Sequence, residues 1–270
     1  MSGGGAGRAR ESRGRRRAVP EQPTALIGQL VDGGPKSRRA SEQLERMGGR
    51  AVPALLRAYD SPHEHLRWEV VNLLGYLKDR RALPLLLESA IHDPEIHPRW
   101  RSIWALSSVD DGNAAARLRA QLTRSRGRRR RNIAVALSIF DDPAAVPVLR
   151  RGLEAKDTWT RWESVSCLAG YGDRDVAQDV LRLYRKERDP GIRREMIRAV
   201  AGVDGQAVFR FLARRLTDPD PDVRAAAAIA LTKTDDAPRA RRVLRKRFDR
   251  ESTRHVVKVL REALAALDER

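Results

Sequence analysis

The chain of 270 residues contains one cysteine, and aromatic residues make up only 5% of it. A single thiol cannot build a disulfide framework within the chain or a thiolate metal site, so neither is expected to stabilise the fold. The scarcity of aromatic residues predicts a core of Leu, Ala and Val, which suits closely packed helices. The one cysteine, Cys167, lies in an apolar helical pattern and is expected to be a buried, unreactive thiol.

Long apolar runs are missing as well. No stretch approaches the roughly 20 consecutive apolar residues that a membrane-spanning helix needs. The basic start of the chain is not followed by an apolar segment, so it is not expected to be a secretory signal. We therefore expect a cytoplasmic protein with a disordered basic tail over residues 1–20 and one elongated domain over residues 21–270.

The motifs that usually mark enzymes are also absent. The sequence holds no G-x-x-x-x-G-K-[ST] phosphate loop, no G-x-G-x-x-G after a strand and no G-x-S-x-G nucleophile elbow. Paired carboxylates such as Asp141-Asp142 recur at a fixed period, which favours helix capping over acid–base catalysis. The sequence therefore predicts no catalytic residue, no metal site and no cofactor.

What the sequence has instead is a repeat of 31 or 32 residues. One apolar ladder consists of Leu86, Leu118, Leu149, Leu181, Leu212 and Leu244. An acidic ladder consists of Asp79, Asp111, Asp142, Asp173, Asp204 and Asp235. A basic ladder consists of Arg67, Arg99, Arg130, Arg161, Arg193 and Arg224. One period shared by apolar, acidic and basic positions predicts tandem structural units.

Each unit is predicted to fold as two helices. In residues 62–93, Leu66, Val70 and Leu74 recur at the spacing of one buried helical face. Asp79 then stands in a short turn, where its carboxylate can cap the second helix. One such pair cannot bury both of its apolar faces, so the units must stack on their neighbours. The predicted fold is an all-α solenoid of about seven two-helix repeats.

The repeat resembles the HEAT-repeat superfamily, most closely the short-repeat branch that includes phycobilin lyase-like proteins. The resemblance is carried by Leu66-Arg67 with Asp79, Ile192-Arg193 with Asp204 and Val223-Arg224 with Asp235. It covers roughly residues 35–268 and implies that these Arg and Asp side chains tie adjacent repeats together. It implies little about function, because such arrays host many activities.

The residue after each ladder arginine varies, and three of the five tryptophans occupy this position. It lies about 200° around the helix from the buried apolar residue, so it is expected to point away from the core. The segment His65–Val70 resembles a site of the deoxyhypusine hydroxylase family, whose di-iron ligands are His-Glu pairs at this position. Here the pairs are Trp68-Glu69, Trp100-Arg101 and Trp162-Glu163, and tryptophan cannot ligate iron. The resemblance implies a position on the inner surface but neither the metal nor the activity.

Our first hypothesis is a non-catalytic scaffold or adaptor that binds a protein partner through the inner surface of the solenoid. The candidate partner-binding residues are Trp68, Trp100, Trp104, Arg128, Arg131, Trp159, Trp162 and Arg194. Trp and Arg are the side chains that most often dominate binding energy at interfaces. The alternative, that each tryptophan fills the groove between neighbouring repeats, stays open on the sequence alone.

The net charge of +18 favours an acidic partner, which can be nucleic acid, an anionic membrane surface or an acidic protein. Arg is used heavily throughout the chain, so compositional drift is an alternative explanation of this charge. Residues 124–131 hold six arginines in eight positions, and this cluster suggests a second hypothesis, nucleic-acid binding. The tryptophans would then stack on bases. A third hypothesis, a lyase-like enzyme or chaperone of the bilin lyase type, rests only on the family resemblance. The sequence determines neither the partner nor the oligomeric state.

Overall fold

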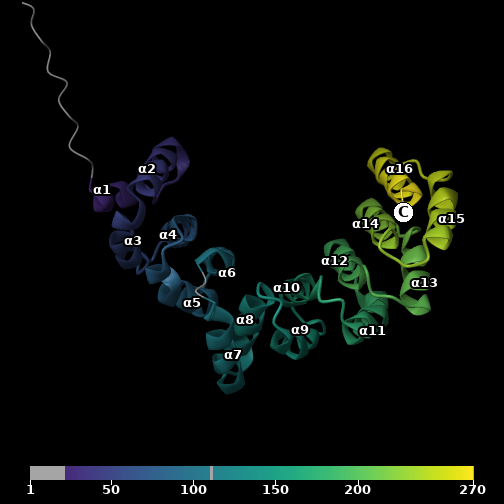
Figure 1. Cartoon of the computed structure of the whole chain (residues 1–270), viewed down its shortest axis with the longest axis horizontal. Coiled ribbons are helices and arrows are strands. Elements are labelled where there is room, and N and C mark those ends of the chain that lie inside the picture. Colours follow the sequence, from purple (N-terminus) through teal and green to yellow (C-terminus); the bar gives the residue numbers. More distant parts are fainter. Residues whose placement is uncertain (1–21, 110–111, 270) are drawn as a thin grey trace, which may run out of the picture.

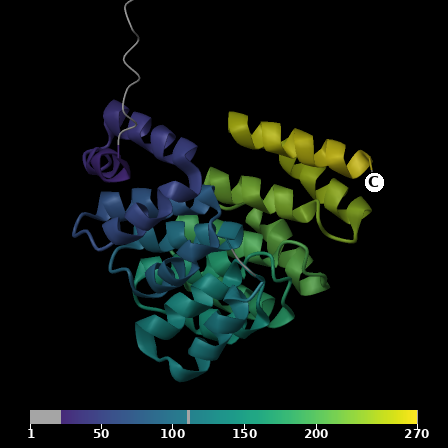
Figure 2. The same ribbon diagram turned by 60° about the vertical axis from the view of Figure 1, so that its left-hand side comes forward.

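The computed structural model describes residues 22–109 and 112–269, and this part of the chain is helical without any strand. Figure 1 shows the helices following one another along a single open arc, with α1 (Pro23–Gly28) near one end. The turned view in Figure 2 shows the same succession from the side. The predicted basic tail, residues 1–20, lies outside the described residues, as does Asp111 of the acidic ladder.

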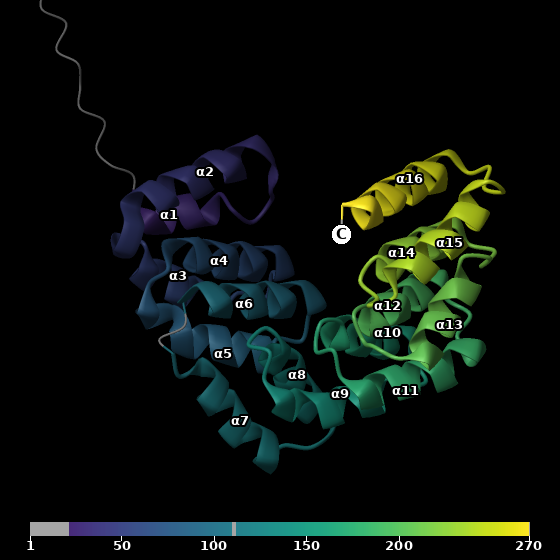
Figure 3. The same ribbon diagram turned by 45° about the vertical axis from the view of Figure 1, so that its right-hand side comes forward.

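Two layers of helices build the arc. The inner helices are α2 (Gly34–Met47), α4 (Glu64–Leu77), α6 (Ile96–Val109), α8 (Gly127–Ser138), α10 (Thr158–Leu168), α12 (Pro190–Val200), α14 (Pro221–Leu231) and α16 (Arg254–Asp268). The outer helices are α3 (Val52–Ala58), α5 (Leu83–His92), α7 (Ala114–Arg124), α9 (Val146–Gly152), α11 (Arg174–Leu183), α13 (Gln206–Arg215) and α15 (Ala237–Phe248). Figures 1 and 3 show the inner helices lining the concave side. The predicted solenoid of about seven two-helix repeats is confirmed.

Aspartates begin many of these helices, because a carboxylate satisfies backbone N–H groups that have no partner inside the first turn. The ladder residues Asp79, Asp142 and Asp173 accept hydrogen bonds from backbone N–H groups of Arg81, Ala144 and Val176. The inner helices α10, α12 and α14 are capped in the same way by Asp157, Asp189 and Asp220.

Capping does not extend to the last two ladder aspartates, so the expectation was wrong there. Gly205 precedes α13 without a side-chain cap, and Asp236 takes the capping role before α15 by accepting from Arg239 N at 3.0 Å. Asp204 and Asp235 pair with each other instead. The hydrogen bond between their carboxyl groups raises the pKa of Asp204 above its ordinary value.

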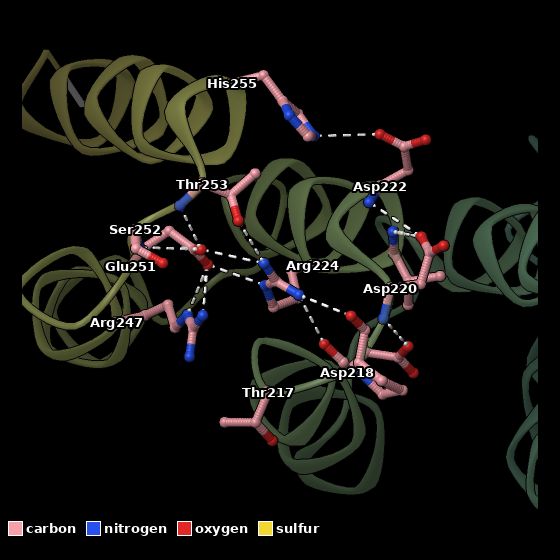
Figure 4. Close-up of polar contacts among 12 residues, drawn as sticks. Thr217, Asp218, Asp220, Asp222, Arg224, Arg247, Glu251, Ser252, Thr253 and His255 are labelled. Atoms are coloured by element: carbon pink, nitrogen blue, oxygen red, sulfur yellow. Dashed lines mark hydrogen bonds and ion pairs between the residues drawn. The ribbon is translucent and has the colours of Figure 1, made fainter.

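Four arginines of the basic ladder tie successive repeats together, as the family resemblance implied: Arg67, Arg161, Arg193 and Arg224. Arg224 Nε and Nη2 donate to the two oxygens of Glu251 at 2.9 and 3.0 Å, and its Nη1 donates to the Asp218 carbonyl (Figure 4). Arg67 holds Asp93 in the same two-pronged manner at 2.9 and 3.1 Å. Each pair joins the first turn of an inner helix to the loop that enters the next repeat.

The stacking of inner helices is interrupted once. Helix α4 packs along α6, and α10, α12, α14 and α16 pack in sequence, whereas α8 packs against α5, α7 and α9 rather than along α6. This interruption brings side chains of α6 within reach of α10. None of the helices in the described ranges combines the length and apolar character that crossing a bilayer requires.

Candidate functional site

Two side-chain clusters gather the predicted tryptophans on the inner helices. The first, which we call the α4–α6 cluster, consists of Trp68, Tyr76, Arg101 and Trp104. The Arg101 guanidinium lies 3.7 Å from the Trp104 ring centroid, 5.5 Å from that of Tyr76 and 5.7 Å from that of Trp68. A cation over aromatic faces is attracted by their quadrupoles, so one arginine holds three rings together.

The second, which we call the central cluster, consists of Trp100, Trp159, Trp162, Arg131 and Glu163. The ring centroids of Trp100 and Trp162 are 6.3 Å apart, and those of Trp159 and Trp162 are 5.0 Å apart. Trp100 Nε1 donates to Glu163 Oε1 at 3.1 Å, and Arg131 Nε lies 3.7 Å from Glu163 Oε2. The Glu163 carboxylate is completely buried, so these partners stabilise a charge that water does not reach.

A groove of about 1050 Å³ lies beside the central cluster on the concave side. Trp100 and Trp162 line it together with small and branched apolar side chains of α14, among them Ile229, which is 52% exposed. Five charged residues also line it, three basic and two acidic: Arg194, Arg198, Lys233, Glu195 and Asp222. The groove thus combines an apolar surface with mostly basic charges.

The eight candidate residues therefore fall into separate groups. Trp104 packs toward α4, whereas Trp100 packs toward α10. Arg194 lines the groove with its Nε 3.6 Å from Glu195. Arg128 is exposed and donates from Nη2 to the Pro94 carbonyl at 2.9 Å.

The sequence left open whether the tryptophans are exposed on the inner surface or packed between repeats, and their burial lies between these two alternatives. Trp68, Trp100, Trp104 and Trp162 are half-buried, and Trp159 is 37% exposed. Trp100 and Trp162 line the groove, so part of each of these two rings stays accessible there. These side chains therefore combine packing with a partly accessible surface.

Sequence reasoning missed Glu163 and Arg101 as members of the two clusters. Glu163 entered only as half of a Trp-Glu pair that cannot bind iron, and Arg101 only as the neighbour of Trp100. A buried position for Glu163 was signalled by its place next to the tryptophan on the inner helix. The sequence held no signal for the rings that Arg101 contacts, because these depend on how α4 and α6 pack.

The predicted burial of Cys167 is confirmed. Its side chain lies at the wall of the groove with 8% of its surface exposed, and desolvation raises the pKa of the thiol to about 12. Within residues 22–109 and 112–269, no three His, Cys, Asp or Glu side chains come together in an arrangement that could hold a metal ion.

Comparisons with solved structures give three likenesses. The YibA protein of Escherichia coli is 17% identical, with 89% of this chain and 91% of that chain covered and a TM-score of 0.57. Human deoxyhypusine hydroxylase in complex with glycerol is 22% identical, with 92% and 96% covered and a TM-score of 0.39. The complex of CpcE and CpcF of phycocyanin lyase from Nostoc sp. is 17% identical, with 66% and 96% covered and a TM-score of 0.38. Of these, the likeness to YibA supports the fold.

A comparison with curated protein sequences found no match. The family model of HEAT repeats matches residues 35–107, 52–138, 115–194 and 180–265, which together span most of the chain. The same span holds the two-layered arc of helices and the arginine ladder that ties its repeats together. The chain belongs to the HEAT-repeat family.

Proposed function

We propose that this HEAT-repeat chain is a non-catalytic scaffold that binds a segment of a protein partner along its concave surface. The observation that carries the proposal is the groove beside the central cluster. It exposes Ile229 and parts of Trp100 and Trp162 on the inner helices, where a partner would bury them. Burial of exposed apolar surface, with Trp and Arg as anchors, is the usual source of binding energy at protein interfaces.

The charges of the groove favour an acidic partner segment. The side chains of Arg194 and Arg198 are 42% and 65% exposed, and Lys233 is exposed as well. Two acids also line this surface: the buried Glu195, which pairs with Arg194 and Arg198, and the exposed Asp222, whose Oδ1 lies 3.2 Å from His255 Nε2. A segment with apolar side chains flanked by Asp or Glu would match the groove in both respects, and its charges would speed association.

The geometry of the rings favours protein over nucleic acid as the occupant. Bases stack on open aromatic faces. Trp100 and Trp162 are half-buried and tilted by 55° to each other, and the Trp100 N–H is already bound to Glu163. The exposed arginines Arg126 and Arg129 are the feature that supports the nucleic-acid alternative. Oligonucleotide binding in low salt, where counterion release is strongest, would test that alternative.

The experiment compares two charge-reversed forms of the chain. The variant combines Ile229→Ser with Lys233→Glu, which changes the groove at exposed positions. The control is Lys246→Glu, a reversal in the exposed last turn of the outer helix α15. Proteins that the wild type captures from nuclease-treated lysate are identified, and the segment that binds is synthesised for calorimetric titration of the wild type, the variant and the control.

We expect the groove variant to bind this segment at least about tenfold more weakly than the wild type, because two side chains at the centre of the surface are lost. The control should bind as the wild type does. Equal affinity of variant and control would place the partner elsewhere on the molecule. Loss of all capture after nuclease treatment would favour the nucleic-acid alternative.

A further inference from the structure

Arg99 lacks the acid that the arginine ladder uses elsewhere. The ladder pairs join residues 25 to 27 positions apart: Arg67 with Asp93, Arg161 with Glu187, Arg193 with Asp218 and Arg224 with Glu251. Ser125 stands at the equivalent place for Arg99, so the loop between α7 and α8 offers Arg99 no carboxylate there. Arg130 has Lys156 26 positions on and Asp157 27 positions on, and Asp157 accepts from the backbone N–H of Thr160 as the cap of α10.

Arg99 and Arg130 carry buried nitrogens without a hydrogen-bond partner. Arg99 is only 2% exposed, and its Nη1 makes no hydrogen bond, nor does Nε of Arg130. Glu163 approaches Arg99 from α10, but the distance from Nη2 to Oε1 is 3.6 Å. The Nε of Arg193 is also unpaired although Arg193 pairs with Asp218, so an unpaired Nε does not set a ladder arginine apart. A buried guanidinium group is normally fully paired, and the free Nη1 of Arg99 therefore points to a missing acceptor.

The carbonyl oxygen that is equivalent to the acceptor of the other ladder arginines accepts a hydrogen bond from Arg128 and not from Arg99. In other repeats the ladder arginine donates from Nη1 to the carbonyl five residues before it, as Arg67 does to Pro62 at 3.1 Å. The equivalent carbonyl for Arg99 is that of Pro94, and it accepts from Arg128 Nη2 at 2.9 Å. The side chain of Arg128 therefore reaches the loop before α6, whose first turn carries Arg99.

The start of α8 is basic where its counterparts are acidic. Asp157, Asp189 and Asp220 cap α10, α12 and α14, but Arg126 precedes α8 and provides no side-chain cap. Cations at a helix N-terminus are unfavourable because they oppose the helix dipole. Burial lowers the pKa of Arg99 despite the attraction of Glu163, and the positive charges of Arg128 and Arg131 lower it further.

We propose that Arg99, Arg128 and Arg131 bind a phosphoryl oxyanion, such as inorganic phosphate, at the junction of α6 and α8. Arg128 and Arg131 lie three residues apart and so share a face of α8. Arg99 and Arg131 approach opposite oxygens of Glu163, which places both guanidinium groups at one spot. The three arginines and Glu163 sum to +3 − 1 = +2, which matches the charge of a phosphate dianion.

The chemistry of the cluster selects phosphate over a simple carboxylate. Guanidinium groups donate pairs of parallel N–H bonds that fit phosphate oxygens, and several of them can surround one tetrahedral anion. The exposed Arg128 and the Arg131 side chain, 29% exposed, form the outer part of the site through which the anion enters. The site is separate from the α12–α14 part of the concave groove, so it does not depend on the scaffold proposal.

The test measures thermal unfolding of the whole chain in inorganic phosphate and in chloride at equal ionic strength. We expect phosphate to raise the melting temperature of the wild type, with an effect that saturates as the phosphate concentration increases. Arg128→Gln, an exposed change that leaves the core intact, should weaken the apparent phosphate affinity by at least about tenfold. The matched control is Arg242→Gln on the exposed face of the outer helix α15, which should respond as the wild type does.

A second variant, Ser125→Asp, restores the missing ladder acid. Its carboxylate would pair with Arg99, so the melting temperature in chloride should rise. The further increase in melting temperature that phosphate causes should become smaller. The proposal is overturned if phosphate has no saturable effect on the wild type. It is equally overturned if Arg128→Gln responds to phosphate as fully as Arg242→Gln does.

Discussion

Trp100 of α6 donates a hydrogen bond to Glu163 of α10 at 3.1 Å, across 63 positions of sequence and past α8. The same carboxylate faces the guanidinium groups of Arg99 at 3.6 Å and Arg131 at 3.7 Å. It is completely buried and joins three inner helices at the place where their regular stacking is interrupted. Glu163 is therefore a buried acid that links α6 and α8 to α10.

Replacing Glu163 by Ala should destabilise the chain strongly. Two arginines would be left facing each other without a counter-charge, and breaking a buried ion pair from one side typically costs about 3–5 kcal/mol. Urea unfolding followed by helical circular dichroism measures the loss. The control is Glu262→Ala, whose side chain is 64% exposed and should change stability by no more than about 0.5 kcal/mol. A similar shift for both variants would contradict the role of Glu163.

The pair of Arg224 and Glu251 should make stability depend on acid pH. Burial alone would raise the pKa of Glu251, but hydrogen bonds from Arg224, Arg247 and Thr253 outweigh it and hold that pKa well below its ordinary value of 4.5. A carboxylate with a depressed pKa in the folded state stabilises the fold above the pKa of the unfolded state. This stabilisation is lost as the pH falls below 4.5 toward the lower folded pKa.

Melting curves of the wild type and Glu251→Gln at a series of pH values test this dependence. At pH 7 the variant should be less stable by about 2 kcal/mol, because the charge that pairs with two arginines is gone. The difference should narrow steadily once the pH falls below about 4.5. A difference that stays constant down to pH 3 would show that the charge of Glu251 contributes nothing.

The fold could be predicted from the sequence because each repeat carries the same pattern of apolar, acidic and basic residues. Leucines at a period of 31 or 32 residues must face one continuous core, and Leu86, Leu118, Leu149, Leu212 and Leu244 are indeed fully buried. The tie between repeats was equally periodic, as Arg67 and Arg224 show with their acids. A pattern repeated this often is insensitive to errors at any one position.

The candidate site could be predicted only in part, because it lies where the repeats differ. The direction of Trp104 depends on the space left by Gly75 in the neighbouring helix, which no periodicity reports. That Arg99 lacks a ladder acid is visible in the sequence, because Ser125 stands 26 residues after Arg99, whereas Asp93 stands 26 residues after Arg67 and pairs with it. This difference lies in the acids that follow the arginines and not in the arginine ladder itself.

Gly75→Ala should destabilise the packing of α4 on α6. A Cβ at this position would lie 2.7 Å from Trp104 Cζ3 and 2.8 Å from the Cβ of Ala105. Alanine is the better helix former by about 1 kcal/mol, but overpacking a close contact costs about 1–3 kcal/mol, so the net change should be unfavourable. Gly28→Ala is the control, because nothing lies within 4 Å of its added Cβ. Thermal unfolding that ranks the two variants equally would contradict the close approach.

Cys167 should resist thiol reagents as long as the chain is folded. Only 8% of its surface is exposed, and desolvation raises its pKa to about 12, so almost no thiolate exists at pH 8. Because the thiolate is the reacting species, a disulfide reagent such as dithionitrobenzoate should modify the folded chain far more slowly than the urea-unfolded chain. A free cysteine in an unfolded chain has a pKa of about 8.5 and provides the internal reference. Rapid modification of Cys167 without urea would mean that the groove wall around this residue opens in the folded chain. Adding the captured partner segment would then show whether binding slows the modification.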